Sequence, residues 1–343
     1  MQTIWFIFIA FILTMYVLLD GFDLGAGAIY PFVAKDDKER RAVQRAILPM
    51  WDGNETWLVA AGGGLFLSFP LLYSASMSGF YLAVFVVLWL LILRGVGLEM
   101  RHLLDNDLWR SFWDGVFFLG SLLLPFFFGV ALANVMRGVP IGRGGKYFFQ
   151  SLWTDPLHPL SKNPGILDWY TVMIGLLALC AVILHGTTYL TMKTTGGLRN
   201  SSRIFAGAFW VATVGLTALA TPLTFYLLPQ RLSHFENAPW GLVFPAAAIA
   251  GILTVGYALA KGRDGLSFGG SCAYIAGMMS STAFAIYPKV LPAVDPSRSL
   301  TIYNASAPHH SLVVGLIAWG LGLLLACIYF AIIYRMFRGR VEV

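Results

Sequence analysis

Long apolar runs follow one another along almost the whole chain, and they decide what it can fold into. Nine are candidates for membrane crossing, and most have the length of about 20 residues that a helix needs to span the hydrocarbon core. They lie near 4–31, 56–74, 78–98, 113–135, 166–192, 204–228, 240–260, 268–290 and 311–335. The sequence therefore predicts an all-α polytopic membrane protein with nine transmembrane helices. The second run, rich in Gly and Ser, and the eighth have the weakest apolar pattern.

The composition agrees with a membrane protein and excludes other classes. Hydrophobic residues make up 58% of the chain and charged residues only 12%, about half the share found in soluble domains. The formal net charge is +6, but the basic residues form no dense stripe, so nucleic acid is not an expected partner. No Lys or Arg precedes the first apolar run, which is therefore interpreted as a membrane helix and not as a cleavable signal peptide.

The distribution of basic residues predicts the orientation of the helices. Loops 35–55, 94–112, 193–203, 261–267 and the C-terminal tail hold 16 of the 23 Lys and Arg residues. Because cytoplasmic loops carry the excess of positive charge, we expect the N-terminus outside and the C-terminus in the cytoplasm. The opposite side holds the remaining seven basic residues: Arg137, Arg143, Lys146, Lys162, Arg231, Lys289 and Arg298.

The connections between the apolar runs are mostly short, so neighbouring helices are expected to pack antiparallel within one integral membrane domain over residues 1–343. The longest loop on the outer side, about 136–165, is rich in Gly and Pro and is predicted to form an irregular cap.

Acidic residues at the ends of the first apolar runs are the strongest functional signal. Asp20 and Asp23 are three residues apart in the first run, and Asp52 and Glu55 have the same spacing where the chain re-enters the membrane. Glu99 lies at the end of the third run. The predicted orientation brings all three sites to the cytoplasmic side. Because a carboxylate in lipid costs roughly 2.5–3.5 kcal/mol, such acids are candidates for a proton or ion pathway.

Structural roles remain open for the same residues. Asp52 could cap the start of a helix by accepting a hydrogen bond from free backbone N–H groups. Glu99 could pair with Arg94 or Arg101 at the membrane interface. Asn54, beside Asp52, could hold water in a proton pathway. On the residues alone, a pathway and structural capping are equally good interpretations.

No metal or haem site is evident from the histidines and cysteines. His185 is the only histidine deep inside a predicted span, and it has no second His or Met at a matching depth to complete a haem site. It is expected to hydrogen-bond a neighbouring helix instead. The three cysteines match no zinc, haem or redox spacing and are interpreted as buried packing residues: Cys180, Cys272 and Cys327.

Several motifs resemble subunit II of the cytochrome bd quinol oxidases, including the cyanide-insensitive branch. The resemblance covers the whole chain and is densest over 16–140. Its most specific element is a Gly-Phe-Asp-Leu-Gly segment at 21–25 followed by a Trp-Asp-Gly-Asn segment at 51–54. The other matching segments are Glu39-Arg40-Arg41, Ser78-Gly79-Phe80-Tyr81, Arg94-Gly95-Val96-Gly97-Leu98-Glu99, Trp113-Asp114-Gly115, Gly120-Ser121 and Gly138-Val139-Pro140.

This resemblance implies a membrane complex that couples quinol oxidation to reduction of dioxygen to water without pumping protons. It implies that haem b, haem d and the quinol site belong to a partner, subunit I. Subunit II of this family has two four-helix bundles plus one further helix, here about 1–136, 166–290 and 311–335. It carries no haem and forms a pseudo-symmetric heterodimer with subunit I in the cell membrane of a bacterial or archaeal-type cell. A structural quinone, small accessory subunits and bound lipid are further possibilities in the family.

The resemblance also implies that subunit II contributes no catalytic residue and lines a cytoplasmic proton route. The family route uses the acid of the Trp-Asp-Gly-Asn segment, here Asp52, and an acid at the end of the third span, here Glu99. The sequence adds Asp20, Asp23 and Glu55 as further candidates. A secondary transporter with ion-binding acids is the rival class, but it predicts acids near mid-span within an inverted repeat, and no repeat is evident.

Overall fold

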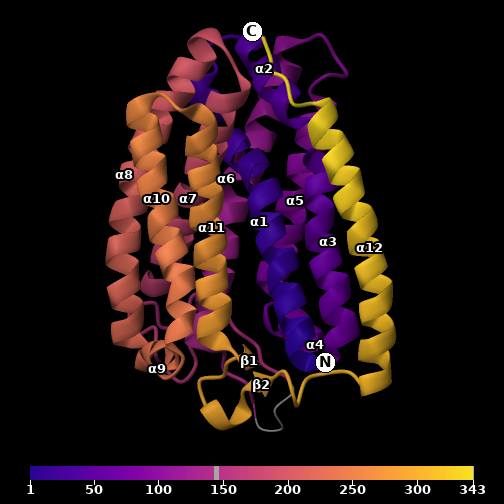
Figure 1. Cartoon of the computed structure of the whole chain (residues 1–343), viewed down its shortest axis with the longest axis vertical. Helices are drawn as coiled ribbons and strands as arrows, with labels where there is room; N and C mark the ends of the chain where they lie inside the picture. The colour runs from indigo at the N-terminus through magenta and orange to yellow at the C-terminus, as the bar shows by residue number, and fades with distance from the viewer. Residues whose placement is uncertain (143–146, 343) are drawn as a thin grey trace.

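The computed structural model describes residues 1–142 and 147–342, and its main feature is a set of long helices aligned along one axis (Figure 1). Arg143 and Lys146, two of the basic residues predicted to face outward, lie outside the described residues. The elements are α1 (Gln2–Val33), α2 (Asp37–Ile47), α3 (Trp51–Ser68), α4 (Pro70–Gly79), α5 (Tyr81–Met100), α6 (Asp107–Arg137), α7 (Trp169–Lys193), α8 (Gly196–Leu227), α9 (Pro229–Asn237), η1 (Pro239–Leu242), α10 (Val243–Lys261), α11 (Asp264–Ile286), β1 (Lys289–Leu291), η2 (Pro296–Arg298), β2 (Leu300–Thr301) and α12 (His309–Met336).

Each of the nine predicted spans coincides with a long helix or a pair of helices. Seven of the helices in the described part of the chain are long and apolar enough to cross a membrane: α1, α5, α6, α7, α8, α10 together with η1, and α12. The other two, α3 and α11, belong to the Gly- and Ser-rich runs whose apolar pattern was weakest. The structure therefore supports a polytopic helical membrane protein, and the number of nine crossings stays a prediction.

Proline accounts for two of the differences between the predicted and the observed boundaries. The second run divides into α3 and α4 at Phe69, since Pro70 has no N–H to continue the first helix and instead begins the second. The eighth run ends at Ile286, and Pro288 is followed by β1, which pairs antiparallel with β2. Sequence reasoning also missed α2, which begins at Asp37 because the side chain of Asp36 accepts a hydrogen bond from the Glu39 amide.

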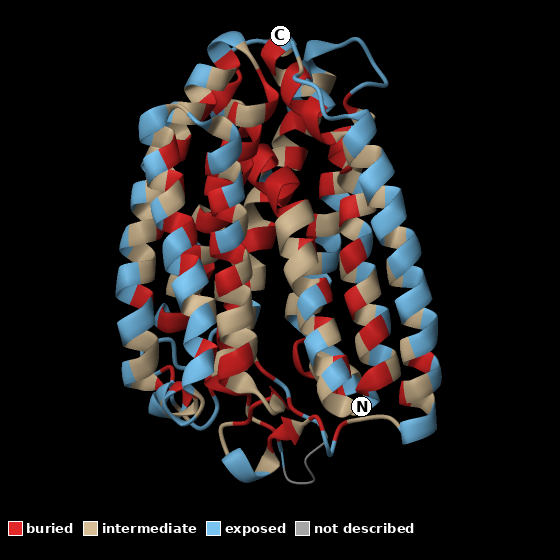
Figure 2. Ribbon diagram, viewed as in Figure 1, coloured by how far each residue is buried: buried red, intermediate tan, exposed pale blue. Residues whose placement is uncertain are grey.

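The long helices pack around α1, which contacts α3, α6, α7 and α11. Buried residues concentrate on the inner faces of the helices, and the outward faces of α8, α10 and α12 are exposed (Figure 2). Gly25 of α1 and Gly186 of α7 lie at a backbone crossing so close that a Cβ on Gly25 would be 2.0 Å from the Val182 carbonyl oxygen. This crossing fixes α1 in the centre of the molecule.

The two ends of the molecule differ in their number of basic residues. The N-terminus lies at one end and the C-terminus at the other, and α2 lies at the C-terminal end (Figure 1). The loops predicted to be cytoplasmic share this second end, which we call the inner end. At the outer end, segments 138–142 and 147–168 contain turns and an isolated bridge from Val139 to Ala293 but no helix. The predicted irregular cap is thus confirmed for these residues.

The last helix, α12, packs along α3 and is tied by hydrogen bonds near its two ends. Only Leu312 and Gly315 of this helix are buried. At the outer end, the Trp5 indole donates a hydrogen bond of 2.9 Å to the Leu312 carbonyl. At the inner end, Lys193 donates to the carbonyls of Phe337 and Gly339. The outward side of α12 presents a broad apolar surface.

Candidate functional site

Two carboxylates of α1 are completely buried near the inner end of the helix bundle. Asp20 and Asp23 both have no exposed surface. They lie three residues apart on α1 and therefore on the same face of the helix. Helices α3 and α5 cover this face and supply the partners of both side chains.

Asp20 forms a buried ion pair with Arg94 of α5. The Arg94 guanidinium donates from Nη2 to Asp20 Oδ1 at 2.7 Å and from Nη1 to Oδ2 at 3.1 Å. Both side chains have an exposed fraction of 0%. Glu55 of α3 lies on the same guanidinium, with its Oε2 3.7 Å from Nη1. One arginine thus compensates two carboxylates inside the bundle.

Asp23 is held by the side-chain amide of Asn54. The Asn54 Nδ2 donates to Asp23 Oδ2 at 2.8 Å and to the Leu19 carbonyl at 3.1 Å. The Tyr334 hydroxyl of α12 donates to Asn54 Oδ1 at 3.1 Å. This bond fixes the amide so that its N–H groups face Asp23. The second oxygen of Asp23, Oδ1, is buried and has no hydrogen-bond partner among the described residues.

We name the set formed by Asp20, Asp23, Asn54, Glu55 and Arg94 the acid cluster. It contains four of the six residues that the sequence predicted for the site. The remaining two, Asp52 and Glu99, are exposed at the inner end. Their side chains form no hydrogen bond or ion pair within residues 1–142 and 147–342.

Both structural alternatives for Asp52 and Glu99 are wrong. Helix α3 begins at Trp51 with Met50 in the capping position, so Asp52 lies inside the first turn and its side chain caps no backbone N–H. Arg94 binds Asp20, and Arg101 binds Asp37 and Asp114, so neither arginine pairs with Glu99. An acid in the first helical turn is still favourable beside the positive end of the helix dipole.

Sequence reasoning missed the role of Arg94 as the partner of Asp20, and it missed Tyr334 entirely. A basic residue inside a run as apolar as α5 was a usable signal for Arg94, since such a charge needs a buried partner. Tyr334 carried no comparable signal, because tyrosines are common at the ends of membrane helices.

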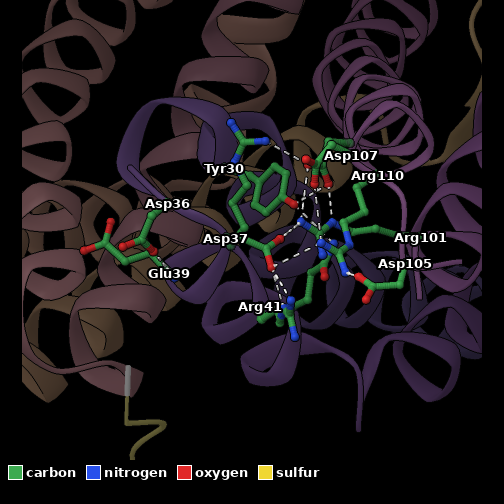
Figure 3. A network of polar contacts seen from close by, with 12 residues as sticks. Tyr30, Asp36, Asp37, Glu39, Arg41, Arg101, Asp105, Asp107 and Arg110 are labelled. Atoms are coloured by element: carbon green, nitrogen blue, oxygen red, sulfur yellow. Dashed lines mark hydrogen bonds and ion pairs between the residues drawn. The ribbon is translucent and has the colours of Figure 1, made fainter. Parts of the chain in front are cut away.

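A second network of charged side chains closes the inner end of the bundle (Figure 3). Asp114 of α6 accepts hydrogen bonds from the Tyr30 hydroxyl, from Arg40 at 2.9 Å and from Arg101 at 2.5 Å. Arg101 also donates to Asp37 at 2.6 Å. The network therefore joins α1, α2, α5 and α6, and it borders an open cavity of about 230 Å³.

The charge of Asp37 is stabilised by this network. Its partial burial raises the pKa, but the hydrogen bonds from Arg101 and Arg41 outweigh this effect and lower the pKa below the ordinary value for Asp. Partial burial and, to a smaller extent, the charge of Arg101 lower the pKa of the neighbouring His102.

His185 links three helices through both of its ring nitrogens. Nδ1 lies 2.8 Å from the Ser271 hydroxyl of α11, and Nε2 lies 2.9 Å from the Leu18 carbonyl of α1. The ring stacks on Phe268 at 4.9 Å. These contacts bear out the expected hydrogen bonding to neighbouring helices. In the described part of the chain, no three His, Cys, Asp or Glu side chains are grouped to hold a metal ion.

The cysteine interpretation is correct only in part. Cys180 and Cys272 are partly buried between helices, but Cys327 of α12 is exposed. The exposed position follows from the apolar outward surface of α12, where a cysteine is tolerated as a small apolar residue.

Comparison with known proteins decides the family. Residues 1–337 match the family model described as cytochrome bd terminal oxidase subunit II. The chain belongs to this family. This match rejects the rival hypothesis that the chain is a secondary transporter. A cytochrome oxidase contains haem, so the complex to which subunit II belongs carries haem, and the subunit has a partner subunit I.

Individual relatives agree with the family. The chain is 30% identical to the probable cytochrome oxidase subunit 2 of Haemophilus influenzae, over 100% of this chain and 95% of the relative. It is 29% identical to the cytochrome bd-I ubiquinol oxidase subunit 2 of Escherichia coli, over 92% and 88%. It is 30% identical to the cytochrome bd ubiquinol oxidase subunit 2 of Bacillus subtilis, over 93% and 90%.

A solved structure supports the fold. The bd oxidase of Geobacillus thermodenitrificans contains a chain that is similar with a TM-score of 0.77 and 20% sequence identity, over 98% of both chains. At this identity the similarity concerns the arrangement of the helices. It agrees with the full-length match to the family.

Proposed function

We propose that this chain is the haem-free subunit II of a cytochrome bd quinol:oxygen oxidoreductase. It scaffolds the haem-bearing subunit I and lines a cytoplasmic route for the protons consumed when dioxygen is reduced to water. The complex conserves energy by charge separation without pumping protons. The observation that carries the proton route is the acid cluster, in which Asp23 keeps one buried carboxylate oxygen without a partner.

The residues divide into an exposed and a buried part of this route. Asp52 and Glu99 are exposed at the inner end, where they can exchange protons with water. Asp23 and Asn54 lie deeper, and Asp20 with Glu55 and Arg94 continues the polar path into the bundle. No group in this subunit is proposed to contact quinol or oxygen.

The cofactors are proposed to reside in subunit I. Both ring nitrogens of His185 are engaged in hydrogen bonds, so this histidine has no lone pair free for a haem iron. Haem b, haem d and the quinol site then belong to the partner in a pseudo-symmetric heterodimer. A structural quinone, accessory subunits and lipid are compatible with the apolar outer surfaces of α8 and α12.

The proposed orientation has the N-terminus outside and the C-terminus in the cytoplasm, with nine crossings arranged as two four-helix bundles and α12. Two observations support it: the termini lie at opposite ends of the molecule, and the Lys- and Arg-rich loops share the inner end. A cysteine replacing the exposed Lys38 of α2, in a variant without native cysteines, should react only with a membrane-permeant reagent. Reaction with an impermeant reagent in intact cells would reverse the orientation.

The test of the proposed function is the Asp52→Asn variant of the assembled complex. Asn has the size of Asp but cannot exchange a proton, so quinol-driven oxygen consumption should fall strongly while haem content stays normal. Glu99→Gln should have the same but a smaller effect, because water can bypass an interfacial acid. Asp107→Asn is the matched control, since Asp107 is a fully exposed acid in the first turn of α6 at the same end. Normal oxygen consumption of Asp52→Asn at normal haem content would refute the route.

The complex itself is tested by its spectrum. The tagged chain, purified from its native membrane, should bring a partner with the absorption bands of haem b and haem d. A pure chain without haem bands, from membranes that oxidise quinol, would refute the assignment to a functional oxidase.

A further inference from the structure

Three basic side chains at one corner of the inner end form no ion pair among the described residues. Arg203 belongs to α8, Lys261 ends α10, and Arg263 lies in the turn before α11. The nearby carboxylate of Asp264 is already engaged by Arg199 at 2.7 Å. This corner therefore carries positive charge that the described part of the chain does not compensate.

The turn between α10 and α11 brings the three side chains together. Gly262 has a φ of +70°, in the left-handed region that favours glycine, so the chain reverses there with Lys261 and Arg263 on either side. The Arg203 guanidinium donates to the Leu259 carbonyl, and a Cβ at Gly262 would lie 3.3 Å from its Nη1. The turn lies at the inner end of the molecule, as does the start of α8 (Figure 1). We call Arg203, Lys261 and Arg263 the basic corner.

An exposed apolar surface begins directly beside the basic corner. Ile204, which is 74% exposed, follows Arg203 in α8, and Tyr257, which is 50% exposed, lies one turn before Lys261 on α10. The outward faces of both helices continue this surface along the bundle (Figure 2). Its other members include Val211, Leu219, Ile249 and Leu253. Positive charge is thus followed by apolar surface along the helix axes.

This order of groups fits an anionic phospholipid. Its phosphate is negatively charged, and Lys and Arg side chains at a membrane surface attract such headgroups. Its acyl chains need an apolar surface, and α8 and α10 are both long and apolar enough to cross a membrane. A free phosphate ion would meet only the charged part of the surface, where exposed charge pairs are weak and are screened by salt.

We propose that the basic corner binds the phosphate headgroup of an anionic phospholipid whose acyl chains lie on α8 and α10. The inference rests on the proposed function in one respect, because the proposed orientation places this lipid in the cytoplasmic leaflet. Arg203 is held by the Leu259 carbonyl, whereas Lys261 and Arg263 are exposed and able to close on a headgroup.

The contribution of the two exposed side chains can be stated as a change in affinity. One Lys or Arg near an anionic membrane surface strengthens binding by about fivefold. Removing the charges of Lys261 and Arg263 together should therefore weaken binding of the lipid by about twenty-five-fold. Arg203 is left in place, because its bond to the Leu259 carbonyl joins α8 to α10.

The test compares the Lys261→Gln/Arg263→Gln variant with a Lys38→Gln/Arg45→Gln variant of the assembled complex. Each variant loses one Lys and one Arg, and all four side chains are exposed at the inner end. The control pair belongs to α2, which has no large apolar side chain exposed. Each complex is stripped of lipid in a neutral detergent and titrated with phosphatidylglycerol, phosphatidylcholine or inorganic phosphate. Native mass spectrometry counts the bound lipids, and the thermal midpoint of the haem bands reports stabilisation by a ligand.

We expect the unaltered complex and the control to hold one more phosphatidylglycerol than the Lys261→Gln/Arg263→Gln variant. Half-saturation of this additional site should need about twenty-five times more lipid in that variant. Phosphatidylcholine should bind equally to all three complexes, and inorganic phosphate should leave their thermal midpoints unchanged. The haem content of both variants should be normal, because the altered side chains are exposed.

Three results would overturn the lipid site. They are equal binding of phosphatidylglycerol by all three complexes, an equal rise of the thermal midpoint with inorganic phosphate, and loss of a bound polypeptide from the Lys261→Gln/Arg263→Gln variant. The second would show a site for a free anion, and the third would show that a protein covers the corner. Lipid binding is measured without turnover, so its failure is distinct from that of the proton route, which Asp52→Asn tests through oxygen consumption.

Discussion

The Asp20–Arg94 pair allows the structural and functional roles of the acid cluster to be separated. Both side chains are fully buried and joined by two hydrogen bonds of 2.7 and 3.1 Å. Removing one member of such a pair leaves an uncompensated charge and typically costs about 3–5 kcal/mol, whereas replacing both by apolar residues of similar volume is often neutral or stabilising. We therefore expect Arg94→Met and Asp20→Leu to be strongly destabilising alone and to rescue one another when combined.

The magnitude can be stated as a coupling energy. The double variant should be more stable than the sum of the single variants by about 3 kcal/mol or more, which is about a hundredfold in an equilibrium constant. Glu55 also loses its cation in Arg94→Met, but its side chain is 22% exposed and keeps contact with water. Its contribution to the loss should be the smaller one.

The assay is the yield and the thermal midpoint of the purified complex, followed by its haem bands, together with quinol-driven oxygen consumption. The double variant should assemble but remain impaired in turnover, since the Asp20 carboxylate of the proposed proton route is gone. The exposed pair Arg298–Asp295 serves as the control, and Arg298→Met should cost about 1 kcal/mol or less. A double variant as unstable as either single variant would refute the reasoning.

Three further predictions concern packing, pH and haem. Gly25→Ala should prevent assembly, because its Cβ would lie 2.0 Å from the Val182 carbonyl oxygen. Gly62→Ala is the control and should assemble normally, because a Cβ at Gly62 would have no atom within 4 Å. Gel filtration of the complex measures both outcomes. The lowered pKa of Asp37 stabilises the folded state at pH values above the pKa of Asp in an unfolded chain, near 3.9. This stabilisation is lost as the pH falls through the pKa of Asp37 in the folded protein. The thermal midpoint of the unaltered complex should therefore drop more between about pH 6 and 3 than that of Asp37→Asn. His185→Ala should leave the haem spectrum of the assembled fraction intact, and loss of one haem's bands with both subunits present would contradict the assignment of haem to subunit I.

The positions of the helices could be predicted from the sequence because helices that face lipid consist of long apolar runs. The exceptions have local causes. Pro70 breaks the second run, and the strand after Pro288 shortens the eighth. The short helix α2 was missed because its residues are mostly charged, and it is held by capping and by contacts with other elements rather than by apolar length.

The acid cluster was predictable as a set of residues but not as a set of contacts. The motifs placed Asp20, Asp23 and Glu55 near one end of the membrane, and the structure joins them. The pairing of Asp20 with Arg94 depends on the Arg94 side chain reaching from α5 to α1, between residues 74 positions apart in sequence. Whether Asp52 caps a helix depends on a shift of one or two residues in the start of α3, which a hydrophobicity pattern does not resolve.

The packing of α12 along α3 affects the order in which the acid cluster is assembled. During synthesis, α12 leaves the ribosome after all the other long helices described here. Until then, the Asn54 amide lacks the Tyr334 hydroxyl that fixes its orientation toward Asp23. A nascent chain that stops short of Tyr334 would therefore contain every carboxylate of the acid cluster but not its finished geometry. The acid cluster therefore reaches its final geometry only when α12 has packed beside α3.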